Sequence, residues 1–81
     1  MKISRIINNK VEALEFLVSE NSALIGTQIQ NLKIKKNNLL GTIMRDNHVI
    51  IPKGSDVLEE NDRVVVVTTT ERLLTLDDIL E

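Results

Sequence analysis

Four consecutive valines, Val64 to Val67, constrain the fold more than any other feature of this sequence. A strand with one solvated face alternates apolar and polar residues, so an unbroken apolar run within residues 63–69 predicts a central strand buried on both faces. Its cover has to come from the chain's own helices or from a partner chain. The 81-residue chain has one Phe and no Cys, so we expect an aliphatic core without a large internal active-site cavity.

Three further segments have the pattern of strands. Residues 11–18 alternate between apolar and polar positions, which is typical of a half-buried strand. The segments 39–45 and 48–51 are separated by the turn dipeptide Asp46-Asn47, so they are predicted to pair as a hairpin. Gly41 inside the first of these segments predicts a bulge or the close approach of a neighbouring strand.

Two segments have apolar residues at helical spacing, which predicts helices over residues 23–32 and 70–81. The sequence therefore predicts the α+β class, as a small β-α-β-β-β-α domain with a mostly antiparallel sheet and two helices. Residues 1–10 are predicted to be a linker or an edge strand from a preceding domain, and residues 11–81 to be the domain itself.

Composition excludes several classes of function. The net charge of −2 lacks the basic footprint of a duplex-binding protein, and Phe16 alone is too little aromatic surface for stacking on single strands. We therefore expect no nucleic-acid partner. Val64–Val67 is the longest apolar run, which is far too short to cross a bilayer, so we expect no direct membrane insertion. The absence of Cys fits a reducing compartment, so we expect a cytoplasmic location.

Catalytic and metal-binding patterns are weak. The single histidine, His48, follows a turn, where an exposed position is more common than a catalytic one; a small hydrolase would have to combine it with Asp46 or Asp56. Adjacent carboxylates such as Glu59 and Glu60 point in different directions, so they share no acid–base or metal site. We expect no catalytic residue, no metal site and no enzyme activity.

Two groups of basic residues remain after these exclusions. Lys33, Lys35 and Lys36 lie in the loop after the first predicted helix, and Arg45 and Lys53 flank the hairpin. Each group alone is typical of a solvated surface. If the fold brings loop and hairpin together, they form a small anion-receptive cleft with apolar walls from Ile34, Leu39 and Ile51.

Five motifs along the chain resemble a known family. They are EALEFLV at 12–18, SALIG at 22–26, LLGTIMR at 39–45, VIIP at 49–52 and DRVV at 62–65. Their order and spacing resemble the TrkA C-terminal domain, also called RCK_C, over about residues 11–80.

This resemblance implies a non-enzymatic, dimerising and ligand-sensing regulatory domain of a potassium uptake system or related cation transporter. It implies a homodimer, a preceding RCK_N domain in a longer chain, and a membrane-embedded transporter subunit as partner. The location it implies is cytoplasmic, peripheral to the inner side of the cell membrane. The alternatives are a similar domain of a cation/proton antiporter or anion transporter, and a structural oligomerisation module without a ligand.

The resemblance also implies a ligand site. It implies no cofactor in this domain, but some members bind cyclic di-AMP between two copies, so this or another nucleotide is the candidate ligand. The basic position of those members corresponds to Lys35, and a lysine cannot form the bidentate fork of an arginine on phosphate. The residues that it predicts to contact the ligand are Ile34, Lys35, Lys36, Asn38, Leu39, Ile51 and Pro52.

Overall fold

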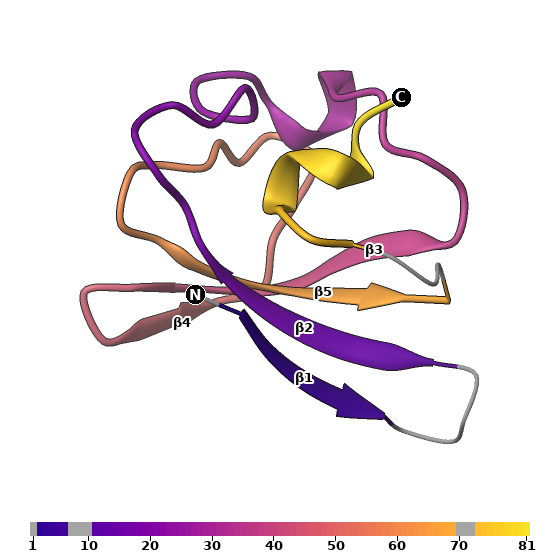
Figure 1. Ribbon diagram of the computed structural model, residues 1–81. Helices are drawn as coiled ribbons and strands as arrows, with labels where there is room; N and C mark the ends of the chain where they lie inside the picture. The colour runs from indigo at the N-terminus through magenta and orange to yellow at the C-terminus, as the bar shows by residue number, and fades with distance from the viewer. Residues whose placement is uncertain (1, 7–10, 70–72) are drawn as a thin grey trace.

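The computed structural model describes residues 2–6, 11–69 and 73–81. One five-stranded antiparallel sheet, in the order β1-β2-β5-β3-β4, runs through the domain (Figure 1). Its strands are β1 (Lys2–Ile6), β2 (Glu12–Leu17), β3 (Asn38–Arg45), β4 (His48–Ile50) and β5 (Arg63–Thr68). The predicted antiparallel sheet is confirmed, and β1 and β4 are its edges.

The valine run forms the central strand β5, which pairs with β2 on one side and β3 on the other. Val64 and Val66 are fully buried, whereas Val65 and Val67 on the opposite face are only half-buried. The chain thus covers one face of β5 and leaves the other accessible. The sequence predicted that β5 is buried on both faces, and within this chain only one face of β5 is buried.

The prediction of two helices was wrong. The described residues of the two segments contain only the short 3-10 helices η1 (Ile29–Asn31) and η2 (Leu76–Ile79). In the first segment Gly26 has φ 84°, a left-handed conformation that ends any right-handed helix, and Ile25 pairs with Leu58 as an isolated β-bridge. The apolar residues still reach the core, but from loops rather than from a helix face.

The C-terminal segment departs from helix for a different reason. Thr75 and Asp78 form a capping box that begins η2. The helix then ends after one turn, because Ile79 and Glu81 make backbone hydrogen bonds to the loop at residues 33–35 instead of continuing the helical pattern. Of the predicted helix over 70–81, residues 70–72 lie outside the described residues.

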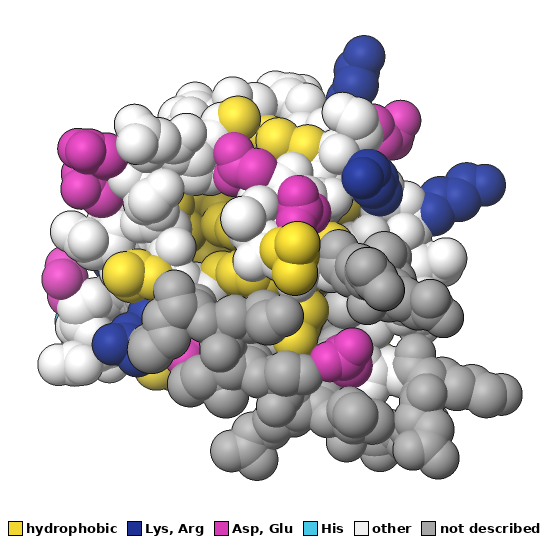
Figure 2. All heavy atoms as spheres, viewed as in Figure 1, with side chains coloured by type: hydrophobic (Ala, Val, Ile, Leu, Met, Phe, Trp, Pro, Cys, Tyr) yellow, Lys and Arg dark blue, Asp and Glu magenta, His cyan; other side chains and the backbone are white. Residues whose placement is uncertain are grey.

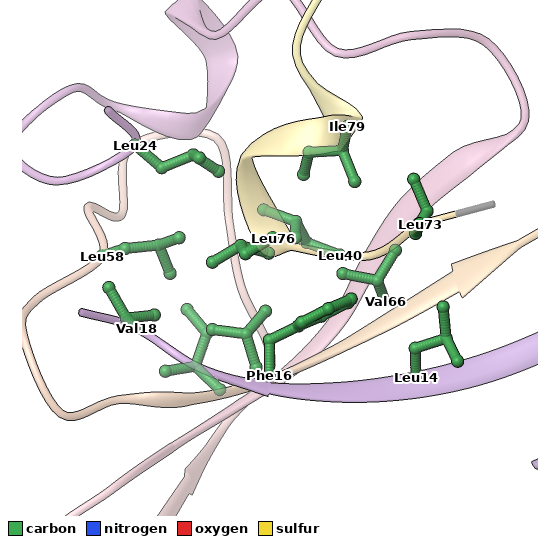
Figure 3. Packing of buried hydrophobic residues seen from close by; sticks show 12 residues of the cluster. Leu14, Phe16, Val18, Leu24, Leu40, Leu58, Val66, Leu73, Leu76 and Ile79 are labelled. Carbon is green, nitrogen blue, oxygen red and sulfur yellow. The ribbon is translucent and has the colours of Figure 1, made fainter. Parts of the chain in front are cut away.

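The core lies between the inner face of the sheet and the loops that contain η1 and η2. Figure 3 shows Leu14 and Phe16 of β2 and Val66 of β5 beneath Leu76 and Ile79 of η2. The domain therefore has two layers, a sheet and a cover of loops with little helix. The buried apolar residues are Leu14, Phe16, Val18, Leu24, Leu40, Ile43, Leu58, Val64, Val66, Leu73, Leu76 and Ile79.

The predicted hairpin and bulge are both confirmed. Strands β3 and β4 pair through the turn Asp46-Asn47, in which both residues have positive φ, 49° and 66°, as a two-residue hairpin turn of type I′ requires. The register of β3 against β5 shifts between Leu40 and Thr42, so Gly41 is the extra residue of a bulge.

Candidate functional site

Residues 33–38, named the basic loop here, are fixed by the C-terminal segment. The backbone N–H of Lys35 donates to the carbonyl of Ile79 at 2.7 Å, and that of Glu81 donates to the carbonyl of Lys33 at 2.8 Å. Between these two bonds Ile34 and Leu80 form an antiparallel β-bridge. The C-terminal segment, residues 79–81, lies beside the loop that follows η1 (Figure 1). These residues therefore set the path of the basic loop.

Asn38 braces the other end of the basic loop. Its amide nitrogen Nδ2 donates to the backbone carbonyls of Lys36 at 3.0 Å and Lys35 at 3.3 Å. Its Oδ1 accepts a hydrogen bond from the Thr68 hydroxyl on β5 at 2.7 Å. Both amide protons of Asn38 are therefore used within the domain, which makes this side chain a support for the loop.

A cavity of about 380 Å³ lies beside the basic loop. Six of the seven residues predicted to contact a ligand line it, and the exception is the exposed Ile51. Lys53 and Gly54, on the loop after β4, complete the wall opposite the basic loop. The predicted residues that line the cavity are Ile34, Lys35, Lys36, Asn38, Leu39 and Pro52.

The cavity has the chemistry of an anion site. Among the described residues, its lining includes three exposed lysines, Lys35, Lys36 and Lys53, and no carboxylate. Apolar side chains, among them Leu39 and Pro52, form most of the remaining wall, together with Asn37, Asn38 and Gly54. A cavity of this size with apolar walls and cations at its rim suits a phosphate-bearing ligand with an apolar or aromatic part.

Arg45 does not belong to this site, which corrects the prediction that it joins Lys53 near the cleft. Its guanidinium donates from Nε and one terminal nitrogen to both carboxylate oxygens of Asp62, each at 2.8 Å, and to the carbonyl of Val57 at 3.0 Å. It also lies 3.1 Å from a carboxylate oxygen of the exposed Glu59. Because Asp62 is only 1% exposed, this pair holds the loop 57–62 against β3.

The environment of this pair shifts both pKa values. Burial by itself raises the pKa of Asp62, but hydrogen bonds from Arg45 and from the backbone of Glu59, with the charge of Arg45, hold it below the ordinary value. The hydrogen bond to Asp62 raises the pKa of Arg45 despite partial burial. Both groups therefore stay charged over the ordinary pH range, as a structural pair.

The other groups weighed from the sequence have structural or surface positions. His48 is exposed, and Asp56 accepts a hydrogen bond from the backbone N–H of Lys53 at 2.7 Å. In residues 2–6, 11–69 and 73–81 no three His, Asp or Glu side chains gather in a group that could hold a metal ion. No helix of that part of the chain is long and apolar enough to cross a membrane.

Sequence reasoning missed two features of the site. Lys53 was grouped with Arg45 rather than with the predicted ligand residues, although its place directly after Pro52 pointed to the same wall. The supporting role of Asn38 had a local signal as well, because an Asn-Asn pair before a strand is typical of a turn closed by side-chain hydrogen bonds. The structure has this turn, with Asn37 at φ 68°.

Comparison with known proteins places this geometry in a family. A family model described as the TrkA-C domain matches residues 13–81. The chain is 34% identical over 70 residues to "Trk system potassium uptake protein trkA homolog 1" of Methanosarcina mazei, covering 86% of this chain and 17% of that protein. It is 40% identical over 62 residues to "Trk system potassium uptake protein TrkA homolog" of Archaeoglobus fulgidus, covering 76% of this chain and 14% of that protein. The chain thus spans about a sixth of the length of the curated relatives it matches.

Proposed function

The chain belongs to the TrkA-C domain family of non-catalytic regulatory domains, and from this premise we propose that it regulates potassium uptake. In this proposal residues 11–81 form the regulatory domain, and residues 1–10, of which 2–6 are the edge strand β1, come from a preceding RCK_N domain. Its partner is a membrane-embedded potassium transporter subunit, which holds the domain at the cytoplasmic face of the membrane. The two relatives named above are potassium uptake proteins, which supports this assignment over an antiporter or an anion transporter.

The cavity beside the basic loop carries the ligand part of the proposal. Its three lysines, with no carboxylate in the part of the lining that the structure describes, favour the phosphates of a nucleotide, and Leu39 and Pro52 offer apolar surface to a base. Cyclic di-AMP is the candidate ligand. Since lysines act as point charges, we expect these contacts to depend on salt more than bidentate arginine contacts do.

The uncovered face of the sheet supports the homodimer. We name this surface the open face. The side chains of Leu39 and Val49 are 64% and 62% exposed on it. The charges of Arg63 and Glu15 on this face neutralise one another, with a guanidinium nitrogen 3.9 Å from a carboxylate oxygen. A contiguous exposed apolar surface is typical of a protein interface. The apolar residues that the strand register places on the open face are Ala13, Leu17, Leu39, Met44, Val49, Val65 and Val67.

A second copy packed on the open face would also reach the ligand cavity. Leu39 belongs to both, because it is exposed on the open face and lines the cavity. In a two-fold symmetric dimer the same residues are presented twice, which suits a ligand with its own two-fold symmetry. Gating then follows if cyclic di-AMP binds one arrangement of the two copies better than another.

Thermal shift with cyclic di-AMP, ATP and NAD(H) tests the ligand assignment. A ligand at 100 times its Kd adds about 2.7 kcal/mol of stability, which raises the Tm of a domain of this size by about 10 °C or more. We expect this shift with cyclic di-AMP and its loss in a Lys35→Gln, Lys36→Gln double variant. Lys33→Gln is the matched control, because Lys33 lies on the same loop but does not line the cavity.

The outcome of that experiment also separates the second candidate function. A structural oligomerisation module predicts a dimer through the open face and no shift with any nucleotide at millimolar concentration. That result would remove the ligand part of the proposal and leave the dimer.

A further inference from the structure

A second cavity lies away from the basic loop, between the end of β2 and the segment that leads into η2. Its volume is about 440 Å³, and residues 16–22 and 74–77 supply its walls. Phe16 and Leu76 are buried beneath it, whereas Leu17 and Leu74 are exposed along its edge. Figure 2 shows hydrophobic atoms recessed in a hollow on this side of the domain, with acidic side chains nearby. The cavity therefore has an apolar floor, and its edge combines exposed leucines with polar side chains.

Hydrogen bonds hold the two walls of this cavity together. Asp77 accepts from the hydroxyl of Ser22 at 2.6 Å and from the backbone N–H of Ala23 at 2.8 Å. Asp78 accepts from the backbone N–H groups of Leu74 and Thr75 at 2.8 and 2.9 Å. The shape of the cavity is thus fixed by the folded chain before any ligand arrives, which reduces the entropic cost of binding.

The charge of this cavity is opposite to that of the cavity beside the basic loop. Residues 16–22 and 73–78 contain Glu20, Asp77 and Asp78 and no Lys, Arg or His. Arg63, which lies opposite Leu17 on β5, is paired with Glu15 at 3.9 Å. The lining itself includes Asp77 and the uncharged polar residues Ser19 and Asn21. Phosphates and carboxylates are disfavoured here by repulsion, so the cavity favours a ligand that is apolar and either neutral or cationic. We name it the acidic pocket.

The exposed leucines indicate what kind of ligand fits. Leu74 is 74% exposed and Leu17 is 44% exposed, and both face solvent at the rim. Large aliphatic side chains around a preformed pocket are typical of a surface that receives an apolar side chain of another protein, with the binding energy concentrated at that anchor. The carboxylates beside the rim complement positive charges next to such an anchor.

We infer that the acidic pocket is a docking site for a partner-protein segment that inserts aliphatic side chains and carries Lys or Arg beside them. This site is separate from the ligand cavity, it meets the open face at Leu17, and it does not depend on the proposed nucleotide ligand. The docking segment would contact Leu17 and Leu74 with its anchor and would place its cations near Asp77 and Glu20.

Titration of the ¹⁵N-labelled domain with two short peptides tests this inference by NMR. The probes are acetyl-Arg-Leu-Leu-Arg-amide and acetyl-Glu-Leu-Leu-Glu-amide, which share the anchor and differ in charge. We expect the basic peptide to shift the amide signals of Ser19, Asn21 and Leu74, and the acidic peptide to bind at least tenfold more weakly. Salt at 0.5 M should weaken the binding of the basic peptide.

Two surface variants complete the test. Leu74→Ser removes the exposed rim leucine without touching the core, and it should weaken binding of the basic peptide at least fivefold. Val49→Ser on the open face is the matched control and should leave binding unchanged. The inference is wrong if the basic peptide shifts no signal around the pocket at millimolar concentration, if both peptides bind equally, or if Val49→Ser rather than Leu74→Ser weakens binding.

Discussion

Replacing Arg45 with Met should be among the most destabilising single substitutions in this domain. The substitution keeps the apolar part of the side chain but removes the guanidinium, which donates at 2.8 Å to each oxygen of Asp62 and at 3.0 Å to the carbonyl of Val57. Asp62 is 1% exposed, and its carboxylate then retains a different partner, the backbone N–H of Glu59 at 2.9 Å. The variant therefore leaves a buried carboxylate without a counter-charge.

The magnitude follows from the lost hydrogen bonds and the burial of Asp62. Removing one partner of a buried ion pair costs about 3–5 kcal/mol. Two lost hydrogen bonds to a charged group, at about 1.5–3 kcal/mol each, give a similar figure. The contact with the exposed Glu59 adds little, because solvent screens it. A domain of this size is stable by about 4–12 kcal/mol in total, so the variant loses a large part of its stability.

Urea unfolding followed by far-UV circular dichroism measures this loss, since the chain has no Trp or Tyr for fluorescence. With a slope of about 1 kcal/mol per molar urea, we expect the midpoint of Arg45→Met to fall by about 3 M or more. Arg63→Met is the matched control; its contact with Glu15 is 3.9 Å long and exposed, so it should cost less than about 1 kcal/mol.

A milder variant covers the case in which Arg45→Met does not fold. Arg45→Lys keeps the charge but loses the bidentate geometry, and it should lose stability measurably more than Arg63→Lys does. Equal midpoints for the Arg45 and Arg63 variants would refute the reasoning, because they would show that burial of Asp62 does not make its partner important.

Three further predictions follow from individual contacts. The folded-state pKa of Asp62 is lowered, so the stability of the domain should be constant above about pH 5 and fall as the pH drops through about 4 and below. Asp62→Asn should reduce this dependence of stability on acid pH. An unchanged pH profile of stability in that variant would contradict the prediction. Gly26→Ala should lower the free energy of unfolding by about 1–2 kcal/mol because Gly26 has φ 84°, although the new Cβ meets no atom within 4 Å. Gly41→Ala, whose new Cβ has ordinary contacts at 3.5 and 3.6 Å, should change the free energy of unfolding by about 0.5 kcal/mol or less. Equal losses of stability for the two variants in urea unfolding would contradict this prediction. Glu81→Pro removes the backbone N–H that donates to the carbonyl of Lys33. Hydrogen exchange of the Lys35 amide should therefore accelerate in this variant but not in Glu81→Ala, which keeps the donor. Equal exchange rates in both variants would show that the C-terminal segment does not hold the basic loop.

The strands were predictable because their signals are local. Alternation in residues 11–18 and the valines of β5 fixed the sheet elements, and Asp46-Asn47 with Gly41 identified the hairpin and its bulge. The helices were not predictable from spacing alone, since Leu73 and Leu76 reach the core as well from a loop and one 3-10 turn as from a helix. The backbone hydrogen bonds of Ile79 and Glu81 to the loop at residues 33–35 favour the single 3-10 turn over a longer helix.

The candidate site was predictable in part for the same reason. The basic loop and Pro52 came from motif order along the chain, and six of the seven predicted residues do line one cavity. The pairing of Arg45 with Asp62 joins residues 17 positions apart through the fold, and no local pattern announces it. Nor does the sequence show that residues 16–22 and 74–77 meet around the acidic pocket.

Isothermal titration of the domain with cyclic di-AMP tests the central claim most directly, because it reports affinity and stoichiometry together. We expect saturable binding of one cyclic di-AMP molecule per two chains. The affinity should fall at least tenfold in the Lys35→Gln, Lys36→Gln variant and stay unchanged in Lys33→Gln. Absence of binding at millimolar ligand, or binding that is unaffected in the double variant, would contradict the central claim.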